Sequence, residues 1–316
     1  MPPPIIIPIS SAEELVRFGV TDVAPLTDEL FRRHQPGLHL VAVSPATDNR
    51  LLGRCSIWGH SIPAPGPEVA GVVGHFAGAD VSTGTALLAA ACQALYQRGC
   101  RMVIGPMDGN TWRSYRLVTT RGVEPPFFLE PTNPEYYPEI FASAGFTPLA
   151  HYYSALADDL NHRDPRLVPV ERRLTEAGVT IRALDIAHFS AEAERIYELS
   201  RIAFTHNFLY TPVPREEFLA QYAALSGSLR PELCRLAEHD GQLVGYVFAI
   251  PDLLQARLGN AIDTVIVKTV AVRPGRLYAG LGSYLVEQVQ PIDPTLGYRR
   301  AIHALMHETN KSRNLS

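Results

Sequence analysis

Residues 265–286 combine a strand pattern, a glycine-containing turn and an apolar helix pattern in one stretch. The stretch reads VIVKTVAVRPGRLYAGLGSYLV, with Gly280 and Gly282 in the turn. A loop that leads into a helix presents unpaired backbone N–H groups, and the helix dipole adds positive potential at that end. Such a point binds phosphate oxygens. The stretch therefore predicts a pocket for a phosphate-bearing cofactor.

The elements that must hold this pocket recur in two halves of the chain. The first half shows apolar strand patterns and two helices, expected at 38–43, 51–58, 69–76, 85–98 (helix), 102–104, 135–144 (helix) and 149–156. The second half repeats that order, with strands at 179–184, 233–237, 243–250, 264–272 and 300–306 and helices at 189–204 and 215–225. The repetition indicates an internal duplication of the fold.

A polar segment, 158–165, separates the halves and ends in proline. It is the best linker candidate, so we predict domains at 1–160 and 161–316. Only the second half has the glycine loop. The first has Asp80-Val-Ser-Thr-Gly-Thr85 in its place, and the Asp80 carboxylate would repel a phosphate. We therefore expect the first half to be a scaffold or adaptor that lacks the phosphate loop.

Composition excludes several classes of protein. The net charge of −4 gives no basic surface for nucleic acid. No apolar run reaches about 18 residues, and the opening MPPPIIIPIS has no basic region, so we expect neither a membrane span nor a signal peptide. The four cysteines form no CxxC pair, which favours reduced thiols in a cytoplasmic protein over disulfides or a zinc site. We expect no bound metal.

The run Val272-Arg-Pro-Gly-Arg-Leu-Tyr-Ala-Gly-Leu-Gly282 resembles the acyl-CoA-binding motif of the GCN5-related N-acetyltransferase (GNAT) superfamily. That motif has Val-x-Pro at the end of a strand and Gly-x-Gly six residues on. The resemblance implies an α/β fold of tandem GNAT-like halves, each a mixed, mostly antiparallel sheet with a splayed parallel strand pair flanked by helices. It also implies a coenzyme A thioester as substrate.

Residue roles follow from the same resemblance. Val270 and Val272 would meet the pantetheine arm, and Asn310 matches a position that often contacts the cofactor. The family usually has Arg or Gln where this chain has Leu277, so Arg276 or Arg313 would supply the charge. The phosphates would be cradled by seven consecutive residues, Leu277, Tyr278, Ala279, Gly280, Leu281, Gly282 and Ser283.

The usual catalytic base of the superfamily is a Glu near the strand 264–272, which here contains no carboxylate. Thr269 in that strand and His303 in the next, together with 310–316, resemble the GNAT-like decarboxylases of polyketide synthase loading modules (curacin type). By that resemblance the two side chains face the gap between the strands and act on malonyl-CoA. Loss of CO₂ leaves an enolate that placed hydrogen-bond donors stabilise.

Three functions are therefore predicted, in order of preference. The first is decarboxylation of malonyl- or methylmalonyl-CoA to an acyl starter for polyketide synthesis, with transfer to an acyl carrier protein as a further step. The second is transfer from acetyl-CoA to a small amine, with a water relay from Asp263 or Glu308. The third is a non-catalytic acyl-CoA-binding module. His206, Asn207 and Tyr210 are expected to line the substrate pocket.

The chain ends at Ser316, early in the helix pattern that follows the strand 300–306. Members of the superfamily have a further hairpin there, which completes the sheet. We therefore expect the C-terminal end of the second domain to be truncated.

Overall fold

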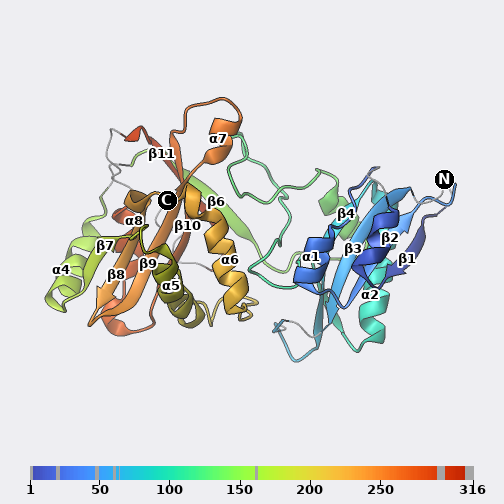
Figure 1. Ribbon diagram of the computed structural model, residues 1–316, viewed down its shortest axis with the longest axis horizontal. Coiled ribbons are helices and arrows are strands. Elements are labelled where there is room, and N and C mark those ends of the chain that lie inside the picture. The colour runs from blue at the N-terminus through green and yellow to red at the C-terminus, as the bar shows by residue number, and fades with distance from the viewer. Residues whose placement is uncertain are drawn as a thin grey trace. The chain divides into compact units, whose positions relative to one another are not determined.

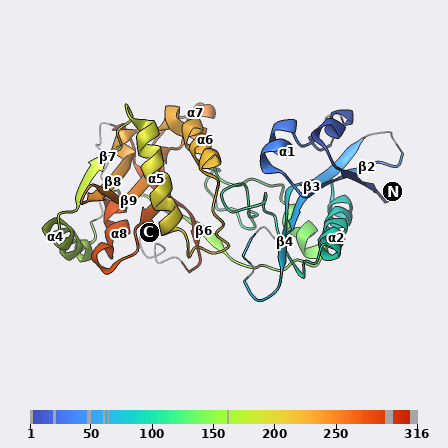
Figure 2. The same ribbon diagram turned by 60° about the horizontal axis from the view of Figure 1, so that its bottom comes forward.

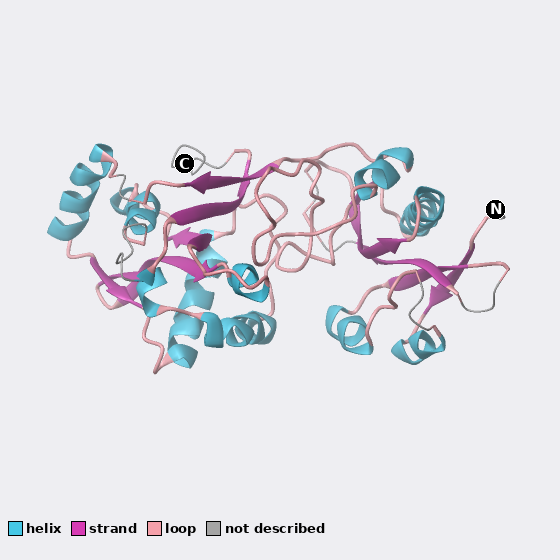
Figure 3. Cartoon of the chain, turned by 90° about the horizontal axis from the view of Figure 1, so that it is seen from above, coloured by secondary structure: helices cyan, strands magenta, loops and turns pink. Residues whose placement is uncertain are grey.

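The computed structural model of the chain describes residues 3–18, 22–46, 50–59, 62–63, 65–160, 163–289 and 296–309. The chain divides into two compact units. The first comprises Met1–Glu124, Pro131–Pro148 and Asn207–Thr211, and the second comprises Pro125–Glu130, Leu149–His206 and Pro212–Ser316. Each unit contains one sheet with helices packed on it (Figure 3).

The sheet of the first unit has the order β1-β2-β3-β4-β5. Its strands are β1 (Ile5–Ile9), β2 (Leu38–Val43), β3 (Leu51–Gly59), β4 (Ala70–Gly78) and β5 (Met102–Ile104). Neighbouring strands are antiparallel except β4 and β5, which pair in parallel from Ala70 to Val72.

Helices cover both faces of this first sheet (Figure 1). Leu40 and Ala42 of β2 belong to the core beneath α2 (Val81–Gln97) and α3 (Tyr137–Ser143). Val41 and Val43 point the other way, toward η1 (Ala12–Arg17) and α1 (Asp28–His34). This alternation is the period of two that a strand buried on both faces shows. The Asp80 carboxylate caps α2 by accepting the Thr83 N–H at 2.7 Å.

The sheet of the second unit has the order β6-β11-β10-β9-β8-β7. Its strands are β6 (Tyr152–Ala157), β7 (Thr180–Ala183), β8 (Cys234–His239), β9 (Gln242–Pro251), β10 (Thr264–Val272) and β11 (Arg300–His307). Among these strands β10 and β11 form the parallel pair, and the other neighbours are antiparallel.

Adjacent residues of β9 identify which helices cover each face of this sheet. A Cβ on Gly245 would meet Leu281 and Leu285, so this face lies against α8 (Leu281–Glu287). The Tyr246 hydroxyl bonds Ser200 of α5 (Phe189–Ala203) at 2.8 Å on the opposite face. Figure 2 shows α5 running across the sheet, with α6 (Arg215–Leu225) beside it. The unit also contains α4 (Val168–Glu176), α7 (Leu253–Arg257), η2 (Pro165–Leu167), η3 (Ser226–Ser228), η4 (Pro231–Leu233) and η5 (Arg276–Tyr278).

The predicted fold class is confirmed, because the chain forms two mixed, mostly antiparallel sheets, each with one parallel pair and flanking helices. One assignment needs correction. The strand expected at 149–156 was to close the first half, but β6 pairs antiparallel with β11, with Ala155 opposite His303. Residues 149–160 therefore lie in the second unit, and β6 stands beside β11, where the resemblance places a later hairpin. In the described part of the chain no helix has the length and apolar character that a membrane span requires.

Candidate functional site

Strands β10 and β11 lie side by side inside the second sheet, between β9 and β6 (Figure 1), and a gap opens where their pairing ends. The two strands pair from Thr264 to Val267 of β10 and from Arg300 to His303 of β11. Beyond that point β10 continues to Val272 and β11 to His307, and no further pairing joins them in the described residues. The splayed parallel pair expected from the sequence is therefore present, and its apex lies at Val267 and His303.

A β-bulge in β10 accounts for this divergence. Val267 pairs with Ala249 and Thr269 with Phe248, so Lys268 is an extra residue opposite β9. A bulge bends its strand and increases its local twist. The Lys268 side chain is exposed, and the bend occurs where β10 leaves β11.

The loop after β10 brings backbone N–H groups to the end of the same strand. The first bond of α8 runs from the Tyr284 N–H to the Gly280 carbonyl at 3.0 Å, so the N–H groups of residues 281–283 precede the helical ladder. Gly280 has φ +83°, and a Cβ there would lie 2.9 Å from Val170 Cγ2. Gly282 lies against the strand, since its Cβ would stand 3.5 Å from both Val270 and Val272.

Helix α4 fixes this loop from outside. The Arg173 guanidinium donates to the Ala279 carbonyl, and the Tyr284 hydroxyl donates to Glu171 Oε1 at 2.6 Å. Burial, and then the Glu171 carboxylate, raise the pKa of Tyr284, which keeps the phenol protonated. Arg276, in η5, is exposed beside the same loop. The loop thus combines N–H groups that have no partner among the described residues with two guanidinium groups, the donors that phosphate oxygens prefer.

The strand edge itself fits a pantetheine arm. Past Val267, β10 has no ladder to β11 among the described residues, while its other edge pairs with β9 as far as Val272. Main-chain N–H and C=O groups on the open edge need partners. The amides of a pantetheine arm lying along residues 269–272 could supply them, so the residues present fit coenzyme A.

Strand register separates the two predicted catalytic side chains. Paired residues on neighbouring strands point to the same face. His303 pairs with Val267, which belongs to the core under α8. Thr269 pairs with Phe248, whose ring contacts Tyr222 of α6. Both residues lie at the apex of the gap, but on opposite faces, because the extra residue Lys268 reverses the alternation.

His303 is 4% exposed. Burial lowers the pKa of its imidazole below the usual value, so the ring is neutral at neutral pH. A neutral imidazole can accept a proton, as a general base must. Thr269 is half-buried.

The two carboxylates considered for a water relay are bound elsewhere. Asp263 accepts hydrogen bonds from Gln255 at 2.8 Å and from the Thr264 hydroxyl at 2.7 Å, at the beginning of β10. These bonds, with Arg300, lower its pKa and make it a weaker base. Glu308 accepts the His151 N–H at 3.1 Å, where β11 meets β6.

The predicted substrate-pocket residues are divided between the units. His206 belongs to the second unit, whereas Asn207 and Tyr210 belong to the first. The Tyr210 ring packs edge-on against Trp112, whose indole N–H donates to the Thr211 carbonyl at 2.9 Å. The role of these three residues in a substrate pocket stays a prediction. Asn310 and Arg313 lie outside the described residues.

Sequence reasoning missed the contribution of α4 to the loop. Val170 and Arg173 contact it directly, yet neither residue matches a motif. The signal that could have found this helix is the proline near its beginning, Pro169, followed by apolar residues at 170 and 174. The bulge at Lys268 has no comparable signal.

Known proteins resemble the chain at different levels. No family model matches it. It is 24% identical over 196 residues to the bacterial ceramide synthase of Caulobacter vibrioides (strain NA1000 / CB15N), a match that covers 61% of this chain and 51% of the relative. The chain therefore spans about half the length of this curated relative.

Several solved structures are similar to the chain. Eis1 from Mycobacterium abscessus matches with a TM-score of 0.48 and 17% identity, covering 97% of this chain and 67% of that one. A GCN5-related N-acetyltransferase from Sphaerobacter thermophilus matches with a TM-score of 0.44 and 15% identity, covering 92% and 80%. The GCN5-related glucosamine N-acetyltransferase region of a fungal multi-domain β-N-acetylglucosaminidase matches with a TM-score of 0.49 and 12% identity, covering 96% and 35%.

Proposed function

We propose that the second unit binds an acyl-CoA in the gap between β10 and β11 and transfers the acyl group to an amine. The observation that carries this proposal is that one strand, β10, contains the bulge and the open edge and leads directly into the loop whose N–H groups precede the α8 ladder. In this proposal Val270 and Val272 meet the pantetheine arm, and residues 277–283 hold the pyrophosphate.

The proposed chemistry uses groups at the apex of the gap. The amine nitrogen attacks the thioester carbonyl carbon, the C–S bond breaks, and the sulfur leaves as a thiolate. A main-chain N–H on the edge of β10 past the bulge, within residues 269–272, stabilises the oxyanion. The neutral His303 imidazole takes the proton that the amine loses and returns it to the thiolate. Thr269, on the other face, orients the acceptor.

A ceramide is an amide of a fatty acid with a long-chain amino alcohol. The likeness to a bacterial ceramide synthase therefore supports amide formation, and it makes a long-chain amino alcohol the first acceptor to test. An acetyl or other short acyl group on a small amine is the other form of the same reaction.

Decarboxylation of malonyl- or methylmalonyl-CoA is the second candidate. The absence of a carboxylate from β10 favours it. In this reaction the bond between the thioester α-carbon and the carboxylate breaks, CO₂ leaves, and the enolate is protonated. Thr269 and His303 would both donate hydrogen bonds to the enolate oxygen, and transfer to an acyl carrier protein thiol would follow.

One assay separates these candidates. The full chain is incubated with acetyl-, malonyl- or long-chain acyl-CoA, with and without a long-chain amino alcohol, and the masses of thioester and acceptor are followed. Release of CoA that requires the amine and yields an amide supports acyl transfer. Conversion of malonyl-CoA to acetyl-CoA without an amine supports decarboxylation and rejects acyl transfer as the main activity. Thioesters that bind and remain intact indicate a non-catalytic module.

Binding is tested with coenzyme A alone and two variants at one position. Ser283→Asp places a negative charge in the first turn of α8, which helices tolerate well, but beside the proposed pyrophosphate. We expect coenzyme A affinity to fall by about tenfold or more. Ser283→Asn is nearly the same size without the charge and should weaken binding much less. Equal affinities of both variants would place the phosphates elsewhere.

A further inference from the structure

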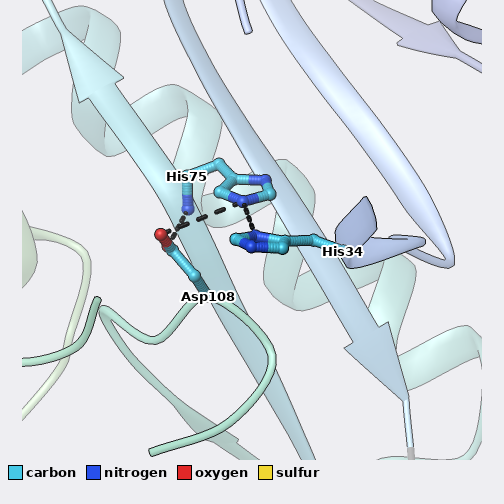
Figure 4. Close-up of side chains that lie close together, drawn as sticks. All are labelled: His34, His75 and Asp108. Carbon is cyan, nitrogen blue, oxygen red and sulfur yellow. Dashed lines mark hydrogen bonds and ion pairs between the residues drawn. The ribbon is translucent and has the colours of Figure 1, made fainter. Parts of the chain in front are cut away.

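Three side chains of the first unit converge in a place that the proposed acyl transfer does not use (Figure 4). His34 ends α1, His75 lies on β4, and Asp108 follows β5. His34 Nδ1 lies 2.7 Å from His75 Nε2, which lies 3.9 Å from Asp108 Oδ2. One ligand atom from each residue falls within 4.8 Å of the others. His34 and His75 are 9% and 6% exposed.

The backbone around these residues is held firmly. The Arg54 guanidinium donates to the His75 carbonyl, and Arg113 donates to the carbonyls of both His34 and Asp108, each at 3.3 Å. Trp58 also donates to the His34 carbonyl, at 2.9 Å. Each of the three residues is therefore fixed through its main chain, so the ligand atoms are positioned before any ligand arrives.

Close approach of two segments creates the cluster. A Cβ on Gly74 would lie 2.1 Å from the Met107 carbonyl oxygen and 2.6 Å from Asp108 Oδ1, so glycine is required there. The same carboxylate oxygen accepts the His75 N–H at 2.5 Å. Asp108 Oδ1 thus accepts a main-chain hydrogen bond, while Oδ2 faces His75 Nε2.

A second layer of hydrogen bonds supports His75. Its Nδ1 lies 2.9 Å from the Ser56 hydroxyl, which lies 2.8 Å from His39 Nδ1. When His75 Nδ1–H donates to Ser56, the hydroxyl can donate to His39, and the lone pair of His75 Nε2 is directed toward His34 and Asp108. Metal-binding histidines show this arrangement, with the far ring nitrogen donating to a fixed oxygen.

The charges around the cluster favour neutral imidazoles. Burial, then the neighbouring His34 and Arg54, lower the pKa of His75 to about 2. Burial also raises the pKa of Asp108, and a bound cation would compensate that partly buried carboxylate. The positive charges of Arg54 and Arg113 oppose cation binding, so net charge alone cannot hold an ion here. Coordination bonds to nitrogen must do so, which disfavours Mg²⁺ and Ca²⁺ because they prefer oxygen ligands.

We propose that His34 Nδ1, His75 Nε2 and Asp108 Oδ2 bind one divalent transition-metal ion of the Zn²⁺ type. Two imidazoles and a carboxylate are a known ligand set for Zn²⁺, with bonds of about 2.0–2.2 Å and ligand atoms about 3.3 Å apart in a tetrahedron. The separations of 2.7 and 3.9 Å bracket that value. The fourth position takes water. This departs from the expectation of no metal, because the ligands lie 41 and 33 positions apart and match no spacing motif.

The test uses the full chain after treatment with a chelator. We titrate it with Zn²⁺ against a chromophoric competitor, measure bound metal by elemental analysis, and repeat the titration with Mg²⁺ and Ca²⁺. The proposal expects one Zn²⁺ per chain, no Mg²⁺ or Ca²⁺, and a visible absorption band when Co²⁺ replaces Zn²⁺. A chain that binds no Zn²⁺, or gives no Co²⁺ band, overturns the proposal without any variant.

Three variants locate the ion. Asp108→Asn keeps an oxygen for the His75 N–H but removes the charge, and His34→Ala removes one nitrogen. Each should abolish stoichiometric binding, and Ser56→Ala should weaken it by about 10- to 100-fold. His188→Ala is the matched control, because it breaks an exposed His–Asp pair at 2.8 Å in the second unit. If His188→Ala loses the ion, or His34→Ala retains it, the cluster is not the site.

Discussion

At the residue scale, His303 is the group on which the proposed acyl transfer depends most. Its low exposure and lowered pKa make it a neutral acceptor of protons at the apex of the gap. We expect His303→Gln to lower kcat by about 100-fold or more while coenzyme A affinity stays nearly unchanged. In the unaltered chain, kcat/KM should rise with pH through a pKa below 6.5 and then level off. If that acidic limb persists in His303→Gln, another group is the base.

Thr269 and His303 point to opposite faces, and this separation can be measured. Side chains that act independently have nearly additive effects, with coupling below about 0.5 kcal/mol. We expect Thr269→Val and His303→Gln to combine additively in kcat/KM for acyl transfer. The double variant is compared with both single variants in one assay. Strong coupling would mean that both groups act on the same atom, as the decarboxylase reading requires.

Two buried histidines, His39 and His75, should make the first unit sensitive to acid. Burial lowers the pKa of His39 to about 3 and of His75 to about 2. The unfolded chain binds protons at these imidazoles, whereas the folded protein keeps them neutral. The free energy of unfolding is therefore greatest above about pH 6.5 and falls as the pH falls. His34 packs on His75 with ring centroids 5.0 Å apart. At pH 5, His39 and His75 should each remove about 2 kcal/mol from the free energy of unfolding.

Tryptophan fluorescence reports this effect, because Trp58 and Trp112 are the only tryptophans and both lie in the first unit. Urea unfolding of metal-free protein at pH 8 and pH 5 gives the loss. His39→Leu should reduce the loss by about 2 kcal/mol, whereas His188→Ala, which changes an exposed ring, should leave it as it is. Unfolding curves of unaltered protein that coincide at both pH values would contradict the assignment of buried neutral rings.

Only part of the residue-scale chemistry could be predicted from the sequence. The glycine loop was recognisable because a tight turn before a helix has a local signature. The opposite directions of Thr269 and His303 were not, because one bulged residue, Lys268, reverses the alternation without changing the apolar pattern. The cluster of His34, His75 and Asp108 was also missed, since only the folded sheet brings such distant residues together.

At the element scale, the contact between α4 and the loop at Gly280 determines where the loop N–H groups lie. Gly280 needs glycine for its φ of +83° and for the 2.9 Å approach of Val170. We expect Gly280→Ala to cost about 2 kcal/mol in stability, partly through the left-handed backbone, and to weaken coenzyme A binding. Adding Val170→Ala should recover the part of the stability loss that is due to contact between the new Cβ and Val170.

Gly259 provides the matched control, because it has φ +81° with nothing within 4 Å of a Cβ. Gly259→Ala therefore measures only the cost in stability of a left-handed backbone at alanine, about 1 kcal/mol, and should leave coenzyme A binding unchanged. Thermal unfolding followed by circular dichroism, together with coenzyme A titration, checks both positions. Equal effects of the two substitutions would show that Val170 does not constrain the loop.

Elements with strong local patterns were predicted well, and their partners less so. β2, β10 and α6 have the predicted bounds, because alternating apolar residues and helix-terminal signals are local. The partner of β6 could not be read in this way. Its apolar run fits either sheet, and the choice depends on which edge is open, here that of β11.

At the scale of the whole molecule, the two units share a strand arrangement with one parallel pair. They differ at the loop that leads from the first strand of that pair into the following helix. In the first unit, Asp80 occupies the helix N-cap and binds the Thr83 N–H. In the second, Gly280 occupies the corresponding N-cap position without a side chain. An occupied cap places a carboxylate where a phosphate would bind, while the glycine leaves the N–H groups open. In the two proposals, the second unit therefore takes the phosphate ligand and the first takes the metal ion.

This division predicts that each ligand protects its own unit. A ligand that binds only the folded state stabilises it by about 2.7 kcal/mol at a concentration 100 times its Kd. Amide hydrogen exchange of the full chain, read by mass spectrometry, should slow with coenzyme A in β10 and α8 while β3 and β4 stay unchanged. Zn²⁺ should do the reverse, because its ligands lie on and around β4. If coenzyme A slows exchange in β3 and β4 as strongly as in β10, the acyl-CoA site cannot belong to the second unit alone.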